Sequence, residues 1–596
     1  MSESKDKLKA IREQMSEKGI DAYIIPVTDP HLGEYVPDHW RIVRWLTGFT
    51  GSAANVLITR DFAGLWTDSR YFVQAEAQLR GTGFELVRLK VPHTPEYIDW
   101  LVENMPAGTK VAADGRIMPL GTVKMMEKAF SRKKISLDTD VDLISGIWQN
   151  RPPMPDAEAF EHPIRFAGKS RAEKIKETRS VMQSMDANYH LLTSLDDIAW
   201  LLNIRGGDVT YSPLFTSFAL LGPGELFLFA PVIKIPGSLQ KKLNDDGVII
   251  KPYESLGDKL GRLEEGKSII LTPGTTSASV FKSIPAGMDI IEEVSIPTRS
   301  KAVKNDVEIE NIRKVMIKDG VAMTKFFYWL ENTVGKEKIT EISAADKLLE
   351  LRMEQEDCTG PSFATIAGYN EHGALPHYCS TPETDVELKP EGIFLLDSGG
   401  QYYGGTTDIT RTICLGEPTA QQKKDFTLAL KGTLNLAMAK FPLGTKGYQI
   451  EMLARKALWD NGLNYGHGTG HGVGCFLNVH EGPQTIGTGA SGDMKTIMEP
   501  GMLTADEPAI YREGEYGFRT ENLILCYEDE KTEYGSFLRF ETVTLCYIDT
   551  SLIDRELMTG EEISWLNDYH KRVYDILGQL LPGETASWLK EKIKAI

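Results

Sequence analysis

The sequence predicts a protein of mixed α/β and α+β class, with two similar α/β domains in tandem followed by a larger unit rich in strand hairpins. Three observations lead to this prediction. A chain of 596 residues is too long for a single hydrophobic core. An order of charged helix, apolar strand and tryptophan-containing segment occurs twice. Beyond the second occurrence, apolar runs alternate with glycine-rich turns.

The first domain is predicted to cover residues 1–155. Residues 4–18 have the pattern of an amphipathic helix, AYIIPV that of a strand, and WLTGFTGSAANVLITRDFAGLWTDSRYF that of a meandering sheet. The segment NRPPMPDAEAFEHP contains four prolines. Because proline cannot continue a helix or a central strand, this segment is predicted to be a linker.

The second domain is predicted to cover residues 156–305, and the third unit residues 306–596. After a helix over residues 171–184, DANYHLLTSLDDIAWLLNIRG echoes DAYIIPVTD and RWLTGFTG of the first domain. Asn305 and Glu308 form a capping box before a helix with an apolar stripe. A helical C-terminal extension is predicted to begin at about residue 549. Within it, Thr559 and Glu562 form a capping box before a helix whose apolar stripe is explained either by packing inside the domain or by a dimer contact.

Composition excludes several classes of function. The formal net charge of −18 and the pI near 5.2 leave no positive field for nucleic acid or an anionic membrane. The N-terminal residues contain no apolar signal-peptide core, and the most apolar stretch, residues 218–233, is interrupted by glycine and proline. The six cysteines contain no CxxC pair, and Cys475 is expected to be a buried thiol. A cytoplasmic protein is therefore expected.

The segment HGTGHGVGCFLNVHEGP, residues 467–483, contains three histidines and five glycines. So much glycine opposes a helix, and this segment therefore differs from the helical HExxH motif of zinc proteases. Glycine instead permits unusual dihedrals and close backbone approach, as in loops and bent strands that line a site. A single histidine here would be typical of polar surface, whereas three together favour a functional segment.

Two further segments place carboxylates around glycine-rich turns. GIFLLDSGGQYYGGTTDITRTICLG contains Asp397 and Asp408, and GMLTADEPAIYREGEYGFRTENLILCYE places Glu507 and Glu521 at corresponding points. Taken alone, the first hairpin favours aspartates that cap turns. Together with a histidine the four carboxylates form an oxygen-rich set without thiolate, which suits two divalent ions such as manganese, cobalt or zinc. A carboxylate at the end of a buried strand also needs a cationic partner.

The segments DSGGQYYGGTTDITRT, HGTGHGVGCFLNVHEGP, DEP and RTEN, in this order, resemble the pita-bread metallopeptidases. The resemblance implies that two metal ions, with manganese favoured over cobalt and zinc, are held by ligands of which Asp408 and Glu521 bridge. The implied ligands are Asp397, Asp408, His471, Glu507 and Glu521. It also implies that His377, His467 and His480 line the substrate site, that Arg519 orients the carboxylates, and that Arg70 contacts substrate.

Within this group the chain resembles the cytosolic three-domain Xaa-Pro aminopeptidases over nearly its whole length, including FTGSAANVLIT, LWTDSRYFVQA and LDDIAWLLNIRG in the creatinase-like N-terminal domains. The resemblance implies release of an N-terminal residue that precedes proline, by attack of a hydroxide held by both metals. Glu507 would serve as ligand and proton shuttle, and His377 and His480 would stabilise the oxyanion. It further implies a homodimer that acts on peptides, while the net charge disfavours nucleic acid and membrane as partners.

Three alternatives remain at this point. A prolidase acting on dipeptides shares the chemistry but carries a single N-terminal domain. A catalytically inactive pita-bread module that binds peptides or proteins would have lost the ligands, whereas this sequence has all five. A creatinase-like amidinohydrolase resembles the two-domain members of the group. Methionine aminopeptidases are much shorter than this chain.

Overall fold

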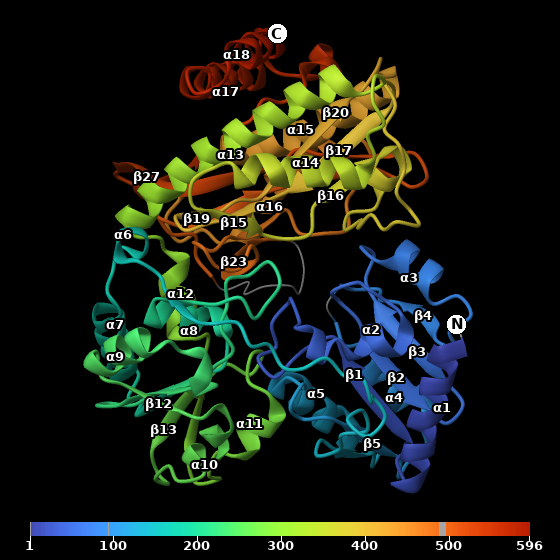
Figure 1. Ribbon diagram of the computed structural model, residues 1–596, viewed down its shortest axis with the longest axis vertical. Coiled ribbons are helices and arrows are strands. Elements are labelled where there is room, and N and C mark those ends of the chain that lie inside the picture. The colour runs from blue at the N-terminus through green and yellow to red at the C-terminus, as the bar shows by residue number, and fades with distance from the viewer. Residues whose placement is uncertain (1, 93, 488–495) are drawn as a thin grey trace. The chain divides into compact units, whose positions relative to one another are not determined.

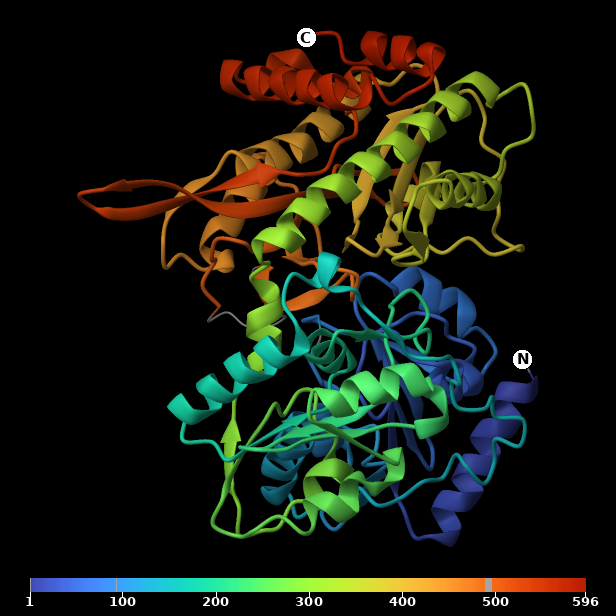
Figure 2. The ribbon, with the colours of Figure 1, turned by 60° about the vertical axis from the view of Figure 1, so that its left-hand side comes forward.

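The computed structural model describes residues 2–92, 94–487 and 496–596, and the chain divides into two compact units (Figures 1 and 2). The first unit comprises Met1–Ile164 and Lys169–Arg299, and the second comprises Arg165–Gly168 and Ser300–Ile596. The short helices α6 (Ile164–Ala167) and α12 (Ile296–Ala302) lie where the chain passes from one unit to the other. Among the residues that the structure describes, no helix is both long and apolar enough to span a bilayer.

The first unit begins with a six-stranded sheet of order β4-β3-β2-β1-β5-β6. Its strands are β1 (Ala22–Pro26), β2 (Asn55–Thr59), β3 (Ala63–Thr67), β4 (Glu85–Arg88), β5 (Lys110–Ala113) and β6 (Ser136–Asp138). Strands β1, β2 and β3 form the predicted antiparallel meander. Strand β4 pairs in parallel with β3, β5 with β1, and β6 with β5. The helices are α1 (Ser2–Glu17), α2 (Ile42–Thr47), α3 (Phe72–Gln78), α4 (Tyr97–Asn104) and α5 (Leu120–Ser131).

A second sheet in the same unit repeats this topology, with order β12-β11-β10-β8-β13-β14. Its strands are β8 (Tyr189–Leu192), β10 (Phe218–Leu221), β11 (Leu226–Phe229), β12 (Val248–Lys251), β13 (Ser268–Leu271) and β14 (Asp289–Glu292). Strand β8 is antiparallel to β10 and parallel to β13, as β1 is to β2 and β5. The common order and directions confirm two related α/β sheets in tandem.

Helix α7 (Arg171–Ser184) precedes this second sheet and has the predicted bounds. The other helices are α8 (Leu195–Leu202), α9 (Gly237–Asp245), α10 (Leu256–Leu260) and α11 (Ala278–Lys282), and a small sheet pairs β7 (Phe160–Glu161) with β9 (Ile204–Arg205). Residues 151–159, in the predicted linker, contain no helix or strand.

The helices of the second unit that follow α12 all contribute residues to one hydrophobic core cluster. They are α13 (Asp306–Thr333), α14 (Glu341–Met353), α15 (Ala420–Ala437), α16 (Gly447–Trp459), α17 (Gly560–Leu577) and α18 (Gly583–Lys592). Both predicted capping boxes are present, at Asn305 with Glu308 and at Thr559 with Glu562. Leu566 and Val573 of α17 belong to the same core cluster as Phe326 of α13. The buried part of the C-terminal stripe therefore packs within the unit.

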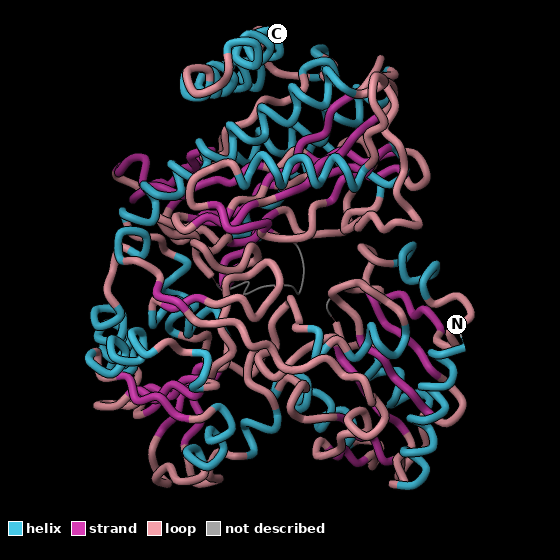
Figure 3. Tube along the Cα trace, in the orientation of Figure 1, coloured by secondary structure: helices cyan, strands magenta, loops and turns pink. Residues whose placement is uncertain are grey.

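The strands of this unit are magenta in Figure 3, and those among the described residues form four sheets. Two have three strands, β16 (Ile366–Tyr369)-β17 (Ile393–Ser398)-β20 (Ile409–Cys414) and β15 (Cys358–Pro361)-β18 (Gly400–Tyr402)-β19 (Gly405–Thr406). The six-stranded sheet has the order β21 (Lys440–Pro442)-β28 (Gly535–Thr542)-β27 (Asn522–Thr532)-β24 (Leu503–Asp506)-β22 (Gly470–Gly472)-β23 (Glu481–Ile486). The last sheet pairs β25 (Ala509–Arg512) with β26 (Tyr516–Arg519).

The two predicted carboxylate hairpins have one design. Strand β17 pairs with β20, and β24 pairs with β27, both antiparallel. Between the partners of each pair, the chain makes an inner hairpin that belongs to another sheet, β18–β19 in the first case and β25–β26 in the second. The outer strands are thereby held side by side at the points where the carboxylates lie.

Candidate active site

The five predicted ligands come from the two outer strand pairs and from the histidine-rich segment. Asp397 lies near the end of β17 and Asp408 directly before β20, while Glu507 directly follows β24 and Glu521 directly precedes β27. His471 is the central residue of β22. Because β22 pairs with β24 in the same sheet, the imidazole is delivered to the end of the glutamate-bearing pair.

Three of these side chains converge closely enough to share one cation. A single ligand atom from each of Asp408, His471 and Glu521 can be chosen so that all three lie within 4.8 Å of one another. Nε2 of His471 is 3.5 Å from Oδ2 of Asp408 and 3.8 Å from Oε1 of Glu507. The other ring nitrogen, Nδ1, lies 2.9 Å from the carbonyl oxygen of Gly472. Since a carbonyl only accepts, Nδ1 carries the proton and Nε2 keeps its lone pair toward the carboxylates.

The crowding of acids at this point has an electrostatic cost. Burial, and then the negative charges of Glu521 and Asp397, raise the pKa of Asp408 well above its ordinary value. Burial and the charge of Asp397 raise the pKa of Glu521 to about 7. Carboxylates in such a place become stable as anions when a divalent cation balances them.

Asp397 supplies a second sign of a metal centre. Its Oδ2 accepts a hydrogen bond of 2.6 Å from Nη2 of Arg519. Its Oδ1 is buried and has no hydrogen-bond partner within the described ranges. A buried carboxylate oxygen without a donor is costly, whereas a carboxylate oxygen is a good ligand for a hard or borderline cation. The residues present therefore fit a divalent metal centre.

Arg519 connects the two acidic pairs. Its Nη2 donates to Asp397, and its Nε donates to Oγ1 of Thr410 at 3.0 Å. The hydroxyl of Thr410 in turn donates to Oε2 of Glu521 at 2.7 Å. The guanidinium is only 2% exposed, so its charge acts in a medium that screens it poorly. Arg519 is thus the cation that the strand-end carboxylate of Asp397 requires.

Two of the three outer histidines stand directly beside the predicted ligands. Nδ1 of His467 is 3.8 Å from Oε2 of Glu507, and its Nε2 is 2.9 Å from the hydroxyl of Tyr511. The ring of His480 stands edge-on to that of His471, with ring centres 4.3 Å apart. His377 lies, half-buried, in the turn that follows the 3-10 helix η4 (Asn370–Ala374).

Arg70 belongs to the first unit, whereas all five predicted ligands belong to the second. Its guanidinium forms an ion pair with Asp68, with Nη2 2.7 Å from Oδ2. The contact of Arg70 with substrate stays a prediction.

The glycines of β22 allow the close approach of neighbouring backbones. A Cβ atom on Gly470 would lie 1.8 Å from the carbonyl oxygen of Ala505, and one on Gly472 would lie 2.2 Å from that of Glu481. Neither glycine has a positive φ. Glycine is therefore needed here to let strands meet around His471, and not for a left-handed conformation.

Replacing Gly470 by alanine is expected to destabilise the protein by about 1–3 kcal/mol, because the added methyl group must displace the backbone at Ala505. Gly468→Ala is the matched control, since its Cβ would have its nearest neighbour, the oxygen of Ile486, at 3.8 Å. Thermal unfolding of the three proteins measures the difference. Equal melting temperatures for Gly470→Ala and the wild type would contradict this account of β22.

Sequence reasoning did not identify Thr410, Tyr511 or Asp506 as parts of the site. Thr410 lies within TTDITRT and Tyr511 within AIYR, where threonine and tyrosine are ordinary strand residues and carry no signal. Asp506 is fully buried, and burial followed by the charge of Glu521 raises its pKa well above the ordinary value. The sequence does show that Asp506 directly precedes Glu507 at a strand end, so the two carboxylates point to opposite faces, and this could have marked Asp506 as a buried acid near the site.

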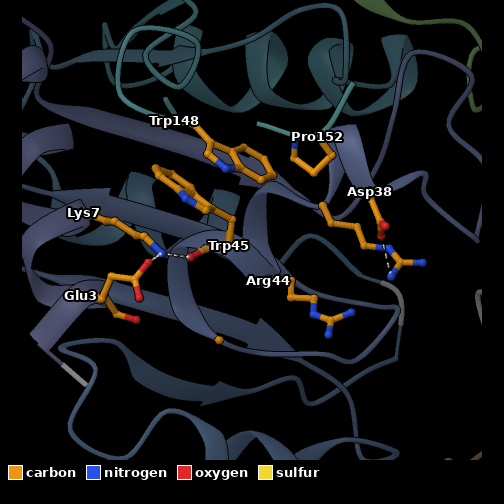
Figure 4. A pocket seen from close by; sticks show the side chains of 10 residues that line it. Glu3, Lys7, Asp38, Arg44, Trp45, Trp148 and Pro152 are labelled. Carbon is orange, nitrogen blue, oxygen red and sulfur yellow. Dashed lines mark hydrogen bonds and ion pairs between the residues drawn. The ribbon is translucent and has the colours of Figure 1, made fainter. Parts of the chain in front are cut away.

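A pocket of about 510 Å³ lies in the first unit (Figure 4). Trp45 and Trp148 stack there with ring centres 4.9 Å apart, and the ammonium group of Lys7 pairs with Glu3 and donates to the Trp45 carbonyl. None of the predicted site residues lines this pocket. It offers no cluster of carboxylates or histidines, so the chemistry is assigned to the second unit.

Comparison with known families accounts for each part of the chain. Residues 310–528 match metallopeptidase family M24, and residues 536–596 match the C-terminal region of that family. Residues 7–144 and 150–308 match two models of the creatinase/prolidase N-terminal domain. These matches place the candidate metal ligands within the peptidase region.

Individual relatives match along the whole chain. The probable Xaa-Pro aminopeptidase P of Aspergillus flavus is 36% identical, over 99% of this chain and 92% of its own length. That of Paracoccidioides brasiliensis is 36% identical, over 100% and 99%. The crystal structure of the Caenorhabditis elegans X-prolyl aminopeptidase, described as a cytosolic enzyme with a di-nuclear active site, is 32% identical, with a TM-score of 0.95 over 100% of both chains. The chain therefore belongs to metallopeptidase family M24, in the branch of the Xaa-Pro aminopeptidases P.

Proposed function

We propose that this protein is a metallo-aminopeptidase that releases the N-terminal residue from peptides whose second residue is proline. One observation supports the proposal: Asp408, His471 and Glu521 converge, with Glu507 beside His471 and the charge of Asp397 acting on Asp408, in a chain that matches Xaa-Pro aminopeptidases P over 99% of its length. A chain of this family that had become a binding module would not need to keep all five.

Two divalent cations held by these residues would lower the pKa of a water molecule toward neutrality and polarise the scissile carbonyl. The residues that would hold the cations are Asp397, Asp408, His471, Glu507 and Glu521, and by the family resemblance Asp408 and Glu521 would serve both cations. Four carboxylates, one imidazole and no thiolate favour manganese, with cobalt and zinc as substitutes.

Glu507 is more exposed than the other acidic ligands, Asp397, Asp408 and Glu521. Its side chain is 20% exposed, whereas that of Asp408 is 5% exposed. We assign to its carboxylate the transfer of a proton from the attacking water to the proline nitrogen that leaves. His377 and His480 would donate hydrogen bonds to the oxygen that becomes negative in the transition state.

Proline sets the main requirement on the substrate site. The bond before proline is a tertiary amide without an N–H group, and the ring fixes φ, so an ordinary aminopeptidase has no donor to hold there. His467, which contacts Tyr511, is proposed to form a wall of the proline pocket. Arg70 of the first unit is proposed to contact the peptide further along.

We also propose that the protein works in the cytosol as a homodimer. The Caenorhabditis elegans relative is described as cytosolic, and the net charge of −18 opposes nucleic acid and anionic membranes as partners. A prolidase is the second candidate in the same class, and the second creatinase-like domain disfavours it.

The peptide Arg-Pro-Pro is expected to be cleaved after arginine, and its acetylated form hardly at all. The free amino group carries a positive charge that meets the acidic site, and the acetyl group both removes this charge and adds bulk where the chain should end. Arg-Ala-Pro should be cleaved much more slowly because alanine underfills the proline pocket. Chromatography of the products after manganese loading measures all three rates.

The dipeptide Arg-Pro separates the two candidates. Faster cleavage of the tripeptide supports an aminopeptidase, and cleavage of the dipeptide alone would identify a prolidase. Equal rates on free and acetylated peptides would refute the assignment as an aminopeptidase.

A further inference from the structure

The segment that carries His377 is attached to the first turn of helix α14 through one buried carboxylate. Glu341 is completely buried, and its two oxygens accept four hydrogen bonds. The donors are the backbone N–H of Tyr369 at 2.8 Å, Nδ1 of His372 at 2.9 Å, the hydroxyl of Tyr378 at 2.8 Å and the hydroxyl of Ser380 at 3.3 Å. These donors lie on both sides of His377 in the sequence.

Backbone groups attach the far end of the same segment to α14. The N–H of Glu341 donates to the carbonyl of Val386 at 3.1 Å, and the N–H of Ile342 donates to Oδ1 of Asp385 at 3.0 Å. The N–H of Leu388 donates to the carbonyl of Ile339 at 2.8 Å. Residues 369–388 are therefore a loop whose two ends and middle are all bound at the start of one helix.

This loop packs on the strands that carry the site. Tyr378 belongs to one buried cluster with Leu395 of β17, two residues before Asp397, and Leu375 packs against this cluster. The carbonyl oxygen of Gly373 would lie 1.8 Å from a Cβ on Gly517 of β26, the strand that ends at Arg519. A displacement of the loop would therefore change the position of His377 relative to the carboxylates.

The charge on Glu341 is favourable where it lies. It is in the first turn of α14, where the helix dipole stabilises an anion. Its hydrogen bond is the largest cause that raises the pKa of His372, and the rings of His372 and Tyr378 stack with centres 4.4 Å apart. A buried carboxylate with four donors holds its neighbours in one arrangement.

We infer that Glu341 is a positioning residue: it fixes the turn of residues 372–380 so that the imidazole of His377 meets the oxygen on which negative charge develops. The inference rests on the proposed function, in which His377 stabilises that oxygen. Glu341 is completely buried and its carboxylate is bound by residues 369–380, so its proposed effect on the reaction passes through the loop.

The test compares Glu341→Ala and Glu341→Gln with Glu562→Ala, in the full-length protein loaded with manganese. Glu562 is the matched control because it is also buried in a first helical turn, that of α17, and binds Lys431 instead of the loop. Glu341→Ala is expected to lower kcat/KM on Arg-Pro-Pro about tenfold or more, mainly through kcat, because a misplaced group loses transition-state contact. Glu341→Gln should recover part of this loss, because the hydroxyl groups of Tyr378 and Ser380 can accept hydrogen bonds from the amide NH2 group instead of donating to a carboxylate oxygen. Glu562→Ala should leave kcat unchanged.

Combination with His377→Ala decides whether the effect passes through His377. In that background Glu341→Ala should cause no further loss, because the group it positions is gone. Additive losses, or an unchanged kcat in Glu341→Ala, would overturn the inference and leave the aminopeptidase assignment standing. Failure to cleave any Xaa-Pro peptide would instead overturn the proposed function. If Glu341→Ala does not fold, Tyr378→Phe, which removes one of the four donors, should show a smaller loss with the same dependence on His377.

Discussion

Replacement of Glu507 by glutamine is expected to lower kcat by at least ~10²-fold while the protein remains folded. The amide keeps the shape of the side chain but removes both the negative charge and the proton acceptor. The effect should be large because Glu507 lies between a proposed metal ligand and a proposed substrate-site residue. Its Oε1 is 3.8 Å from Nε2 of His471, and its Oε2 is 3.8 Å from Nδ1 of His467. Steady-state kinetics on Arg-Pro-Pro, with the metal content of the variant measured in parallel, checks the result.

The control for this variant is Glu513→Gln, in the exposed turn between β25 and β26. It removes a carboxylate close to Glu507 in sequence and should leave kcat unchanged. Near-wild-type turnover by Glu507→Gln at full metal loading would show that Glu507 has no essential role in proton transfer.

Removal of metal by a chelator is expected to abolish activity, and manganese should restore it better than magnesium. A histidine among carboxylates favours the softer ion, and magnesium gives up its water ligands reluctantly. The stripped protein should also unfold at a lower temperature, because a ligand that binds only the folded state stabilises it. Burial, and then the charges of Glu521 and Asp397, raise the pKa of Asp408, and without a cation nothing balances these charges.

Elemental analysis and a melting curve accompany the activity assay. Asp408→Asn should retain less metal than the wild type after dialysis, because it loses one of the two shared carboxylates. Full activity in excess chelator, with no metal found in the protein, would end the proposal of a metal centre.

Features that depend on a few neighbouring residues could be predicted from the sequence. The bounds of α7, the capping box at Asn305 and Glu308, and the non-helical segment around His471 follow from local propensity and capping. The repeated order of helix, strand and aromatic segment was enough to predict two related domains, whose common strand order the structure confirms. The five proposed ligands come from the resemblance of their segments to the pita-bread metallopeptidases, and these segments are conspicuous because they combine glycine with histidine or carboxylates.

The inner hairpins were beyond such reasoning. The sequence predicts that Asp397 and Asp408 flank a turn, and β17 does pair with β20. It does not reveal that β18 and β19 leave this pair and join β15 in another sheet. Which strands pair depends on which sheet edges are free in the folded unit. The alternation of apolar and polar residues along one strand does not specify its partner.

The sequence by itself determined the capped helices, the repeated order of helix and strand, and the residue types that can hold a metal, because each can be recognised from a few neighbouring residues. Only the tertiary structure decided which groups meet. Arg519 reaches Asp397 across 122 positions, and Glu341 reaches Tyr378 across 37. Contacts between residues so far apart in the sequence form only when packed sheets and helices bring their side chains together and exclude water. A buried charge is then stable only if the fold places an opposite charge or a hydrogen-bond donor beside it.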